Sequence, residues 1–553
     1  MNQFFTAVLL LTASLAGAQS LVWGGRFGGD GEDVILAMHT DALGNTYTTG
    51  YFTYTADFDL TDAEYLLTTN IDFEIFLQKT APDGSLIWAK SMGGEFGDYG
   101  TKITTDSSGN VYLTGVFQDT ADFDPGDAEF LLTATGSLDI FIVKLNADGQ
   151  FMWAKHFEGP DYEESNGIGI DSQDNIYLSG YFYAELDFDP SDATHAITPA
   201  GGDGFLVKLT KDGGFVWVKA IGGSDFDLVT GMHTRPDGHT FLSGNFRETA
   251  EFDTPDGLVT LSADDGFDGI FVCHADQNGQ FLKATKVAQV ENGGYGLSVA
   301  TDSQGNAFVT GYLNGEGTFE TEEGTVTMTP TDFINGYIAK IFPNGTLAWA
   351  RHLQGTGVTT GYAIAVNSHD DVFVSGYFNG TMNLGDVVLT EQSALDTESF
   401  AAKLHTDGQF VWAAQLGGIN TVDRAAMSID PQDNILLGSA FEGTVDLDPG
   451  AAALTAASVD FRDVFLVKLS DHSLAVATHE NPGALSFHPN PVRDRLYVTA
   501  NEASVPTDFI LFDHLGRAVQ NGEFQSGSID LSGLHTGVYH LRTGGQCYKI
   551  IKQ

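Results

Sequence analysis

Short runs in which β-branched or aromatic residues alternate with small or polar ones fill most of this chain. In one stretch they read GIGIDS, NIYLSGYF, GFLVKLT and FVWVKAIG, between residues 167 and 222. Period-two alternation between Gly, Asn and Asp turn signals predicts four short β-strands. The tight turns DSQDN and TKDGG join the first pair and the last pair of these strands. No helical periodicity competes, so we expect an all-β protein.

The four-strand pattern recurs through the chain. The markers are a tryptophan and a glycine, each spaced 63 to 67 residues from its next occurrence: Trp23, Trp88, Trp153, Trp217, Leu282, Trp349 and Trp412, with Gly50, Gly115, Gly180, Gly244, Gly311, Gly376 and Ser439. Seven copies are therefore present. A four-stranded antiparallel sheet cannot bury both faces alone, and radial stacking of such sheets does. The pattern predicts a seven-bladed β-propeller.

The seventh copy lacks one strand. It supplies AAMSIDPQ, NILLGSAF and DVFLVKLS, but no tryptophan-bearing fourth strand follows Ser470. Residues 20–29, SLVWGGRFGG, have the sequence of that missing strand. We therefore expect SLVWGGRF to pair with DVFLVKLS and to close the ring with the N-terminal strand, which removes a free sheet edge.

The repeat also resembles a known family. The patterns D-x-x-G-N-x-Y-x-T-G-x-F, D-x-F-x-x-K-L and D-G-x-F-x-W-A-K, recurring over residues 20–470, resemble the bacterial SBBP β-propeller repeat. The resemblance implies the fold. It leaves function open, because propellers host binding, catalysis and scaffolding alike.

The two ends of the chain differ from the repeat region of residues 19–470. Residues 1–18 have an apolar run from Phe4 to Leu15 and then Ala16-Gly17-Ala18, which predicts a signal peptide. No later apolar run is long enough for a transmembrane helix. Residues 471–484 read as a polar linker. Residues 485–553 contain four or more short strand patterns, which predict a small β-sandwich-like domain.

That last domain resembles the type A C-terminal sorting domain of type IX secretion in Bacteroidetes. The matching residues are Pro489, Asn490, Pro491, Asp513, Gly516, Arg517, Gly537, Tyr539, Lys549 and Lys552. The resemblance implies the type IX secretion machinery as a partner. It also implies export through the outer membrane, followed by removal of the domain with release of the protein or its attachment to the cell surface.

Composition narrows the choice of partners. The chain has 74 acidic and 25 basic residues, a net charge of −49. Such a charge repels nucleic acid and anionic membrane surfaces. The two cysteines, Cys273 and Cys547, cannot form a disulfide framework, and Cys273 in GIFVCH fits a small buried core residue.

Paired aspartates open the inserts between the second and third strands of several copies, in DFDLTD, DFDPGD, DFDPSD and DLDPG. The pairs are Asp57 with Asp59, Asp122 with Asp124, Asp187 with Asp189, and Asp446 with Asp448. Carboxylates two residues apart on an extended segment share one side and would suit calcium, the one cofactor that the residues suggest. The alternative is that each aspartate forms an Asx-turn and stays solvated.

No catalytic motif is present. The histidines show no zinc-site spacing, and neither a G-x-S-x-G elbow nor a Walker loop occurs. The repeated tryptophans fit packing between blades better than sugar binding. We expect a secreted or surface-attached, non-catalytic protein that binds a polysaccharide or a protein through its acidic face of long loops. Two alternatives remain: a polysaccharide-degrading glycosidase or lyase with carboxylates in the central funnel, and a passive structural component of the cell surface.

Overall fold

The computed structural model describes residues 19–552 except 62, 70–72, 392–396, 420–421, 451, 472–484, 489–491, 501–507, 513–516, 525–527, 536 and 544–545. All elements in this part of the chain are β-strands, which confirms the all-β prediction. The chain divides into two compact units, Met1–Ser473 and Leu474–Gln553. The predicted signal peptide lies outside the described residues. No helix in the described part of the chain could cross a membrane.

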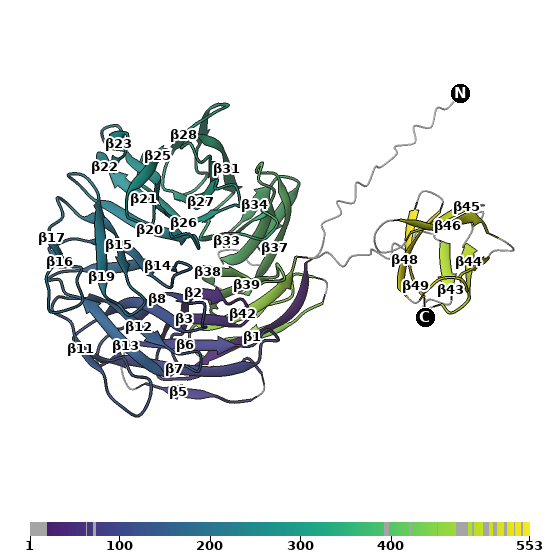
Figure 1. The fold of residues 1–553 in the computed structure, drawn as a ribbon, viewed down its shortest axis with the longest axis horizontal. Helices are drawn as coiled ribbons and strands as arrows, with labels where there is room; N and C mark the ends of the chain where they lie inside the picture. Colours follow the sequence, from purple (N-terminus) through teal and green to yellow (C-terminus); the bar gives the residue numbers. More distant parts are fainter. Residues whose placement is uncertain are drawn as a thin grey trace, which may run out of the picture. The chain divides into compact units, whose positions relative to one another are not determined.

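The described strands of the first unit form seven main sheets, each built on four antiparallel strands in chain order (Figure 1). The first strands are β2 (Val34–Thr40), β8 (Tyr99–Thr105), β14 (Glu163–Ile170), β20 (Asp227–Thr234), β26 (Gly294–Thr301), β32 (Ala363–Val366) and β38 (Val422–Ile429). The second strands are β3 (Thr46–Phe52), β9 (Val111–Phe117), β15 (Ile176–Phe182), β21 (Thr240–Arg247), β27 (Ala307–Leu313), β33 (Val372–Phe378) and β39 (Ile435–Phe441).

The third and fourth strands complete these sheets. The third strands are β6 (Glu74–Thr80), β12 (Asp139–Leu145), β18 (Asp203–Leu209), β24 (Asp268–Ala275), β30 (Asn335–Ile341), β36 (Glu398–Leu404) and β42 (Asp463–Ser470). The fourth strands are β7 (Leu86–Gly94), β13 (Phe151–Phe157), β19 (Phe215–Ile221), β25 (Phe281–Val290), β31 (Leu347–Gly355), β37 (Phe410–Ile419) and β1 (Ser20–Gly29). We number the sheets first to seventh in the order of their first strands.

The fourth strand of the seventh sheet comes from the N-terminal part of the chain. Strand β1 pairs antiparallel with β42, with Ser20 opposite Ser470 and Phe27 opposite Val464. The predicted pairing of SLVWGGRF with DVFLVKLS is confirmed. Apolar side chains from this sheet, including Phe27 and Leu466, are buried with Ile35, Phe52 and Phe76 of the first sheet.

The inserts between second and third strands are short hairpins that cover the outer edges of the sheets. They are β4 (Thr55–Asp57) with β5 (Leu66–Thr68), β10 (Thr120–Asp122) with β11 (Leu131–Thr133), β16 (Leu186–Asp187) with β17 (Ala196–Ile197), β22 (Thr249–Thr254) with β23 (Gly257–Ser262), β28 (Gly317–Thr321) with β29 (Gly324–Met328), β34 (Thr381–Leu384) with β35 (Val387–Thr390), and β40 (Thr444–Asp446) with β41 (Thr455–Ala457).

Each hairpin lies against the fourth strand of the preceding sheet, either in the same sheet or, for β16 and β22, through a single bridge. The edge strands are thereby shielded from pairing with other chains. An apolar residue just after or within the first hairpin strand anchors each hairpin, and all are buried to 1% exposure or less: Phe58, Phe123, Phe188, Phe252, Phe319, Leu384 and Leu447. Burial of one such side chain contributes about 2 kcal/mol.

Tryptophans tie successive sheets together, except at the fourth sheet, which carries Leu282 at this position. The Trp23 ring lies against Gly84, where an added Cβ would come within 2.8 Å of a ring atom, and Trp23 Nε1 donates to the Pro82 carbonyl at 3.0 Å. The φ of Gly84 is 87°, so this turn needs glycine for its backbone as well as for the ring. Trp88 and Trp349 donate in the same way to turns of the following sheets. The predicted packing of tryptophans between copies is confirmed by these contacts.

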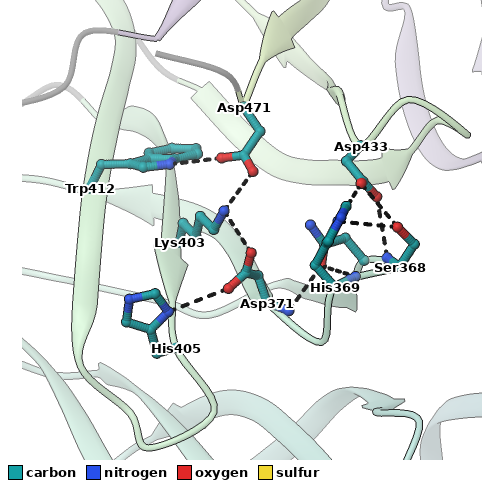
Figure 2. Close-up of polar contacts among 9 residues, drawn as sticks. Ser368, His369, Asp371, Lys403, His405, Trp412, Asp433 and Asp471 are labelled. Atoms are coloured by element: carbon teal, nitrogen blue, oxygen red, sulfur yellow. Dashed lines mark hydrogen bonds and ion pairs between the residues drawn. The ribbon is translucent and has the colours of Figure 1, made fainter. Parts of the chain in front are cut away.

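Lysines on the third strands reach the same turns, except in the fourth sheet, where His274 takes the place of the lysine, and in the sixth. Lys79 Nζ donates to the Ala147 carbonyl, whereas Lys403 Nζ lies 2.6 Å from Asp471 Oδ2 (Figure 2). Trp412 Nε1 also donates to Asp471, at 3.1 Å. Because the fourth strand of the seventh sheet is β1, no turn follows β42. The Asp471 carboxylate, directly after β42, takes the place of that turn.

Acidic residues are buried where one sheet meets the next. Asp33 and Asp463 lie on either side of Gly28, where an added Cβ would come within 2.7 Å of an oxygen of each. Arg26 Nη1 donates to Asp463 Oδ2 at 2.7 Å. Burial and the Asp463 charge raise the pKa of Asp33 to about 8, although the Gly29 amide and Arg26 act the other way.

The second unit contains two sheets. One orders β43 (Leu485–His488), β44 (Arg495–Ala500) and β47 (Ser528–Asp530), and the other orders β46 (Ala518–Glu523), β45 (Asp508–Phe512), β48 (Gly537–Thr543) and β49 (Gln546–Lys552). Leu496 and Ile529 of the first sheet share a buried cluster with Leu511, Leu541 and Ile550 of the second. The predicted small β domain therefore has an apolar core of its own.

Replacement of Trp23 should weaken the contact between the seventh and first sheets. We expect Trp23→Ala to lower the free energy of unfolding by about 2 kcal/mol, because it removes ring packing and one hydrogen bond. The matched control is Val22→Ala, next to it on β1, whose side chain is 52% exposed. It should change stability by less than about 0.5 kcal/mol. Equal urea midpoints for the two variants would show that Trp23 does not stabilise the contact between the seventh and first sheets.

Stability should also depend on pH through Asp33. Its pKa is raised from 3.8 to about 8 in the folded protein, so between these values the folded chain holds a proton that the unfolded chain has lost. Stability from this group is then lost as pH rises, by at most about 1.4 kcal/mol per pH unit. We expect Asp33→Asn to flatten the fall in stability between pH 5 and 8. Asp148→Asn, on an exposed turn, should leave the profile of the parent protein unchanged.

Candidate functional site

A cavity of about 730 Å³ lies among the first strands of the sheets in the first unit. Residues from β2, β8, β14, β20, β26, β32 and β38 all contribute to its lining. Each first strand adjoins the first strand of the next sheet, and β38 in turn adjoins β2 (Figure 1). The cavity is therefore assembled from all seven copies, although any one copy contributes only a few side chains.

Tyrosines dominate the polar part of the lining. They are Tyr181, Tyr183, Tyr295, Tyr312, Tyr362 and Tyr377. Several rings contact one another, with centroids 5.6 Å apart for Tyr181 and Tyr183 and 5.2 Å apart for Tyr295 and Tyr312. Burial raises the pKa of Tyr312 to about 12. These rings offer both flat apolar faces and hydroxyl groups to a molecule in the cavity.

Glu164, on β14, is the carboxylate of this lining. Its Oε2 accepts hydrogen bonds from the hydroxyls of Tyr162, at 2.7 Å, and of Tyr181. Burial and the neighbouring carboxylate raise the pKa of both tyrosines, so both keep their protons at neutral pH. Two donors on one oxygen fix the carboxylate, and no described residue donates to Oε1. Lys102, on the neighbouring strand β8, is the other charged residue among the described lining residues.

The remaining lining is of two kinds. Hydroxyl and amide side chains come from Thr101, Asn166, Thr230, Ser298 and Thr360, whereas Met38, Ile103, Ile168, Met232, Ile364 and Met427 form an apolar belt. Part of the polar set is occupied with structure, because Thr101 and Thr230 each donate to a carbonyl of the next first strand. The cavity thus combines fixed polar groups with apolar surface, as ligand sites do.

The paired aspartates predicted from sequence lie elsewhere, on the hairpin turns. Asp57 Oδ1 accepts the amides of Asp59, at 3.1 Å, and Tyr65, at 2.8 Å. Asp122, Asp187 and Asp446 accept the equivalent two amides. Their partners Asp59, Asp124, Asp189 and Asp448 each cap a further amide two residues on.

These hydrogen bonds have the Asx-turn geometry of the alternative interpretation. The first aspartate of each pair holds the ends of a hairpin loop together. No group of three or more His, Cys, Asp or Glu residues in the described part of the chain is arranged to hold a metal ion. Calcium at the paired aspartates stays a prediction.

The residues predicted for the sorting signal are spread over the second unit. Pro489, Asn490, Pro491, Asp513 and Gly516 lie outside the described residues. Gly537 begins β48 and pairs with Lys552 on β49, whereas Lys549 pairs with His540. Tyr539 is buried, and its hydroxyl donates to the His535 carbonyl at 2.8 Å. Arg517 is exposed directly before β46.

Sequence reasoning missed the cavity residues. It searched the tryptophans and the acidic inserts, and the structure uses the former for packing and the latter as edge hairpins. A usable signal was present: the positions equivalent to Glu164 in the other six copies are Val34, Tyr99, Leu228, Tyr295, Thr360 and Asp423. A position that packs identically in each copy would not vary in this way. The prediction of a buried Cys273 is confirmed, with 1% exposure.

Comparison with known proteins gives two family matches. Residues 486–553 match the secretion system C-terminal sorting domain, and residues 87–116 match the beta-propeller repeat of SBBP type. The second match covers most of β7 and β9 and all of β8, which is less than one four-strand copy.

Among curated proteins, the chain is 24% identical over 434 residues to the WD repeat-containing protein L264 of Acanthamoeba polyphaga mimivirus. The match covers 66% of this chain and 31% of that protein, so the chain spans about a third of its relative's length.

Solved structures with similar folds include Sqt1 from Chaetomium thermophilum, at 11% identity and a TM-score of 0.36, covering 81% of this chain and 99% of that one. PorZ, a surface component of the type IX secretion system of Porphyromonas gingivalis, matches at 10% identity and 0.27, covering 93% and 70%. An ulvan lyase of polysaccharide lyase family 25 matches at 9% and 0.31, covering 87% and 93%.

The family matches confirm both resemblances predicted from the sequence. A sorting tail of this family indicates export to the cell surface or the medium. The chain combines SBBP-type beta-propeller repeats with the C-terminal sorting domain of type IX secretion.

Proposed function

We propose that residues 19–470 form a closed seven-bladed β-propeller and that each main sheet is one blade. Two observations support this architecture. The first strands adjoin one another in a cycle that returns from β38 to β2, and β1 completes the seventh sheet beside β42. Residues 1–18 act as the signal peptide, 471–484 as the linker and 485–553 as the sorting domain.

The propeller is a binding protein that is released or attached to the cell surface after type IX export. The observation that carries this function is the tyrosine-lined cavity, in which Glu164 is held by two tyrosine hydroxyls. A carboxylate fixed in this way, beside open aromatic faces, suits recognition of a polar ligand. The site is present without any movement of the chain, so little binding free energy is lost to ordering it.

A neutral polysaccharide is the ligand class that this lining fits best. Sugar rings present apolar faces that pack on tyrosines and hydroxyls that exchange hydrogen bonds with Glu164, Asn166 and tyrosine hydroxyls. Phosphorylated, sulfated or uronic-acid polymers would meet a protein of net charge −49 and be repelled. A protein ligand and a purely structural role are the alternatives that the binding experiment separates.

The geometry favours binding over polysaccharide cleavage. Glycoside hydrolysis generally needs two carboxyl groups about 5 to 10 Å apart, and Glu164 is the one carboxylate among the described lining residues. A lyase would need a base at neutral pH. Tyr181 is unsuited to that role, because burial and Glu164 raise the pKa of its hydroxyl.

The full mature protein should bind neutral polysaccharide without cutting it. We expect retention on insoluble neutral glucans and mannans in a pull-down assay, weak retention on alginate, and no increase in reducing ends or in absorbance of unsaturated sugars. Tyr183→Ala and Tyr312→Ala should each weaken binding about tenfold, because each removes one stacking face. Tyr54→Ala, at an exposed tyrosine outside the cavity lining, is the matched control and should bind normally.

Other outcomes of this assay would redirect the proposal. New chain ends above background would replace binding by cleavage. Retention that Tyr183→Ala and Tyr312→Ala leave intact would remove the cavity as the site. Absence of retention on any polymer would leave a protein ligand or a structural role.

After the signal peptide has directed the protein to the periplasm, export across the outer membrane should require only residues 485–553. A periplasmic reporter that carries a signal peptide and residues 485–553 should reach the cell surface or medium of a bacterium with type IX secretion. The same reporter without residues 485–553 should stay in the periplasm. Equal distribution of the two reporters in fractionated cells would contradict the assigned role of these residues.

A further inference from the structure

Two buried carboxylates face each other where the third sheet meets the fourth. Asp203 begins β18 and is 8% exposed, whereas Asp227 begins β20 and is 1% exposed. A Cβ added to Gly222 would lie 2.4 Å from Asp203 Oδ1 and 3.0 Å from Asp227 Oδ2. The two carboxyl groups therefore border the same small space between the sheets.

Only one of the two oxygens of each carboxylate accepts a hydrogen bond from a described residue. Asp227 Oδ2 accepts the Gly223 amide at 2.5 Å, and Asp203 Oδ2 accepts the Ala200 amide at 3.4 Å. The Oδ1 atom of each is cut off from solvent and accepts no hydrogen bond within the described structure. A buried carboxylate oxygen without a partner is costly, and such groups are normally paired or bound to a metal.

The local charge makes this cost larger. No described Lys, Arg or His forms an ion pair with either residue, and Arg247 pairs instead with Asp268 at 3.1 Å. Asp225, two residues before Asp227, adds a third negative charge nearby, and the three carboxylates repel one another. Protons or a cation from outside the chain are therefore needed to balance the charge of Asp203 and Asp227.

Two other junctions balance the charge at the equivalent positions from within the chain. Between the seventh and first sheets, Arg26 Nη1 lies 2.7 Å from Asp463 Oδ2. Between the fifth and sixth, the positions carry the neutral residues Asn335 and Thr359. Asn335 Nδ2 donates to the Gly357 carbonyl at 3.1 Å, and Thr359 Oγ1 accepts the Gly336 amide at 2.9 Å. The junction of Asp203 and Asp227 has neither solution.

We propose that this junction binds a calcium ion through Asp203 Oδ1 and the carboxylate of Asp227. A single proton would neutralise one carboxylate and leave the other charged and buried, whereas a divalent cation balances both. Calcium accepts carboxylate oxygens together with backbone carbonyls and water. Two carboxylates correspond to a weak site, with a dissociation constant on the order of 10⁻⁴ to 10⁻³ M, the range of extracellular calcium modules.

This site differs from the exposed pairs such as Asp187 with Asp189. There, the Asp187 Oδ1 atom already accepts two backbone amides, so the hairpin turn is complete without an ion. At Asp203 and Asp227 the Oδ1 atoms are buried and unpaired. The ion would join the third strand of one sheet to the first strand of the next, and its role would be to hold two neighbouring sheets together.

Thermal unfolding of the full mature protein tests the site. We expect about 5 mM calcium chloride to raise the Tm by about 2 °C relative to a chelator, and calorimetric titration to give one site in the millimolar range or tighter. Magnesium should have a smaller effect, because it gives up its water less readily.

The decisive variant introduces the neutral residue types of Asn335 and Thr359, from the junction of the fifth and sixth sheets, at positions 203 and 227. Asp203→Asn with Asp227→Thr should fold, lose the calcium response and be at least as stable as the parent in chelator, because the repulsion is gone. Asp187→Asn with Asp189→Asn is the control and should keep the response. Absence of a calcium response in the parent would overturn the proposal. A response that survives the first variant and disappears in the second would also overturn it.

Discussion

The fold of the first unit depends on the burial of both faces of each four-stranded sheet by its two neighbours. A sheet of this size cannot fold alone, so stability is shared along the series and rests on the contacts between successive sheets. Those contacts are apolar at the centre, as for Phe27 and Phe76. In addition, a tryptophan such as Trp23 and a lysine such as Lys79 donate hydrogen bonds to carbonyls in a turn of the next sheet. In the seventh sheet, the Asp471 carboxylate accepts the hydrogen bonds of Trp412 and Lys403 that a turn carbonyl accepts in other sheets.

The same requirement explains where acidic residues are buried. At two junctions the sheets meet at a glycine with no room for a side chain, and carboxyl groups of both sheets gather around it, as Asp33 and Asp463 do around Gly28 and Asp203 and Asp227 do around Gly222. Amides of the glycine-rich strand end satisfy one oxygen, and the second needs an arginine, a proton or a cation. The electrostatic cost differs between junctions, so the junctions differ in pH and ion dependence although their backbones are alike.

Repetition made most of this fold predictable. Alternation of side-chain types identified the strands, the spacing identified the seven copies, and a missing tryptophan after Ser470 identified β1 as the partner of β42. The docking of hairpins on the preceding sheet was not predictable, because it joins consecutive copies and leaves no periodic signal within either. The cavity was missed for the same reason: Glu164, Tyr181 and Tyr183 belong to one copy, but Tyr295, Tyr312 and Tyr377 meet them from the others. Only the three-dimensional cycle of first strands brings these residues together.

Positions at which the same residue type recurs in each copy therefore differ in role from positions at which the residue type varies between copies. A residue that recurs at each copy, such as the anchor represented by Phe58, satisfies a packing need that every sheet has. Glu164 satisfies no such need, since valine, leucine, threonine, tyrosine and, in the seventh copy, Asp423 occupy its place elsewhere, and yet two tyrosine hydroxyls are committed to holding it. Placing a fixed carboxylate where apolar residues suffice costs stability without improving packing. Under the proposed function, that cost serves recognition of a ligand in the cavity, for which an asymmetric site in a repetitive scaffold provides orientation.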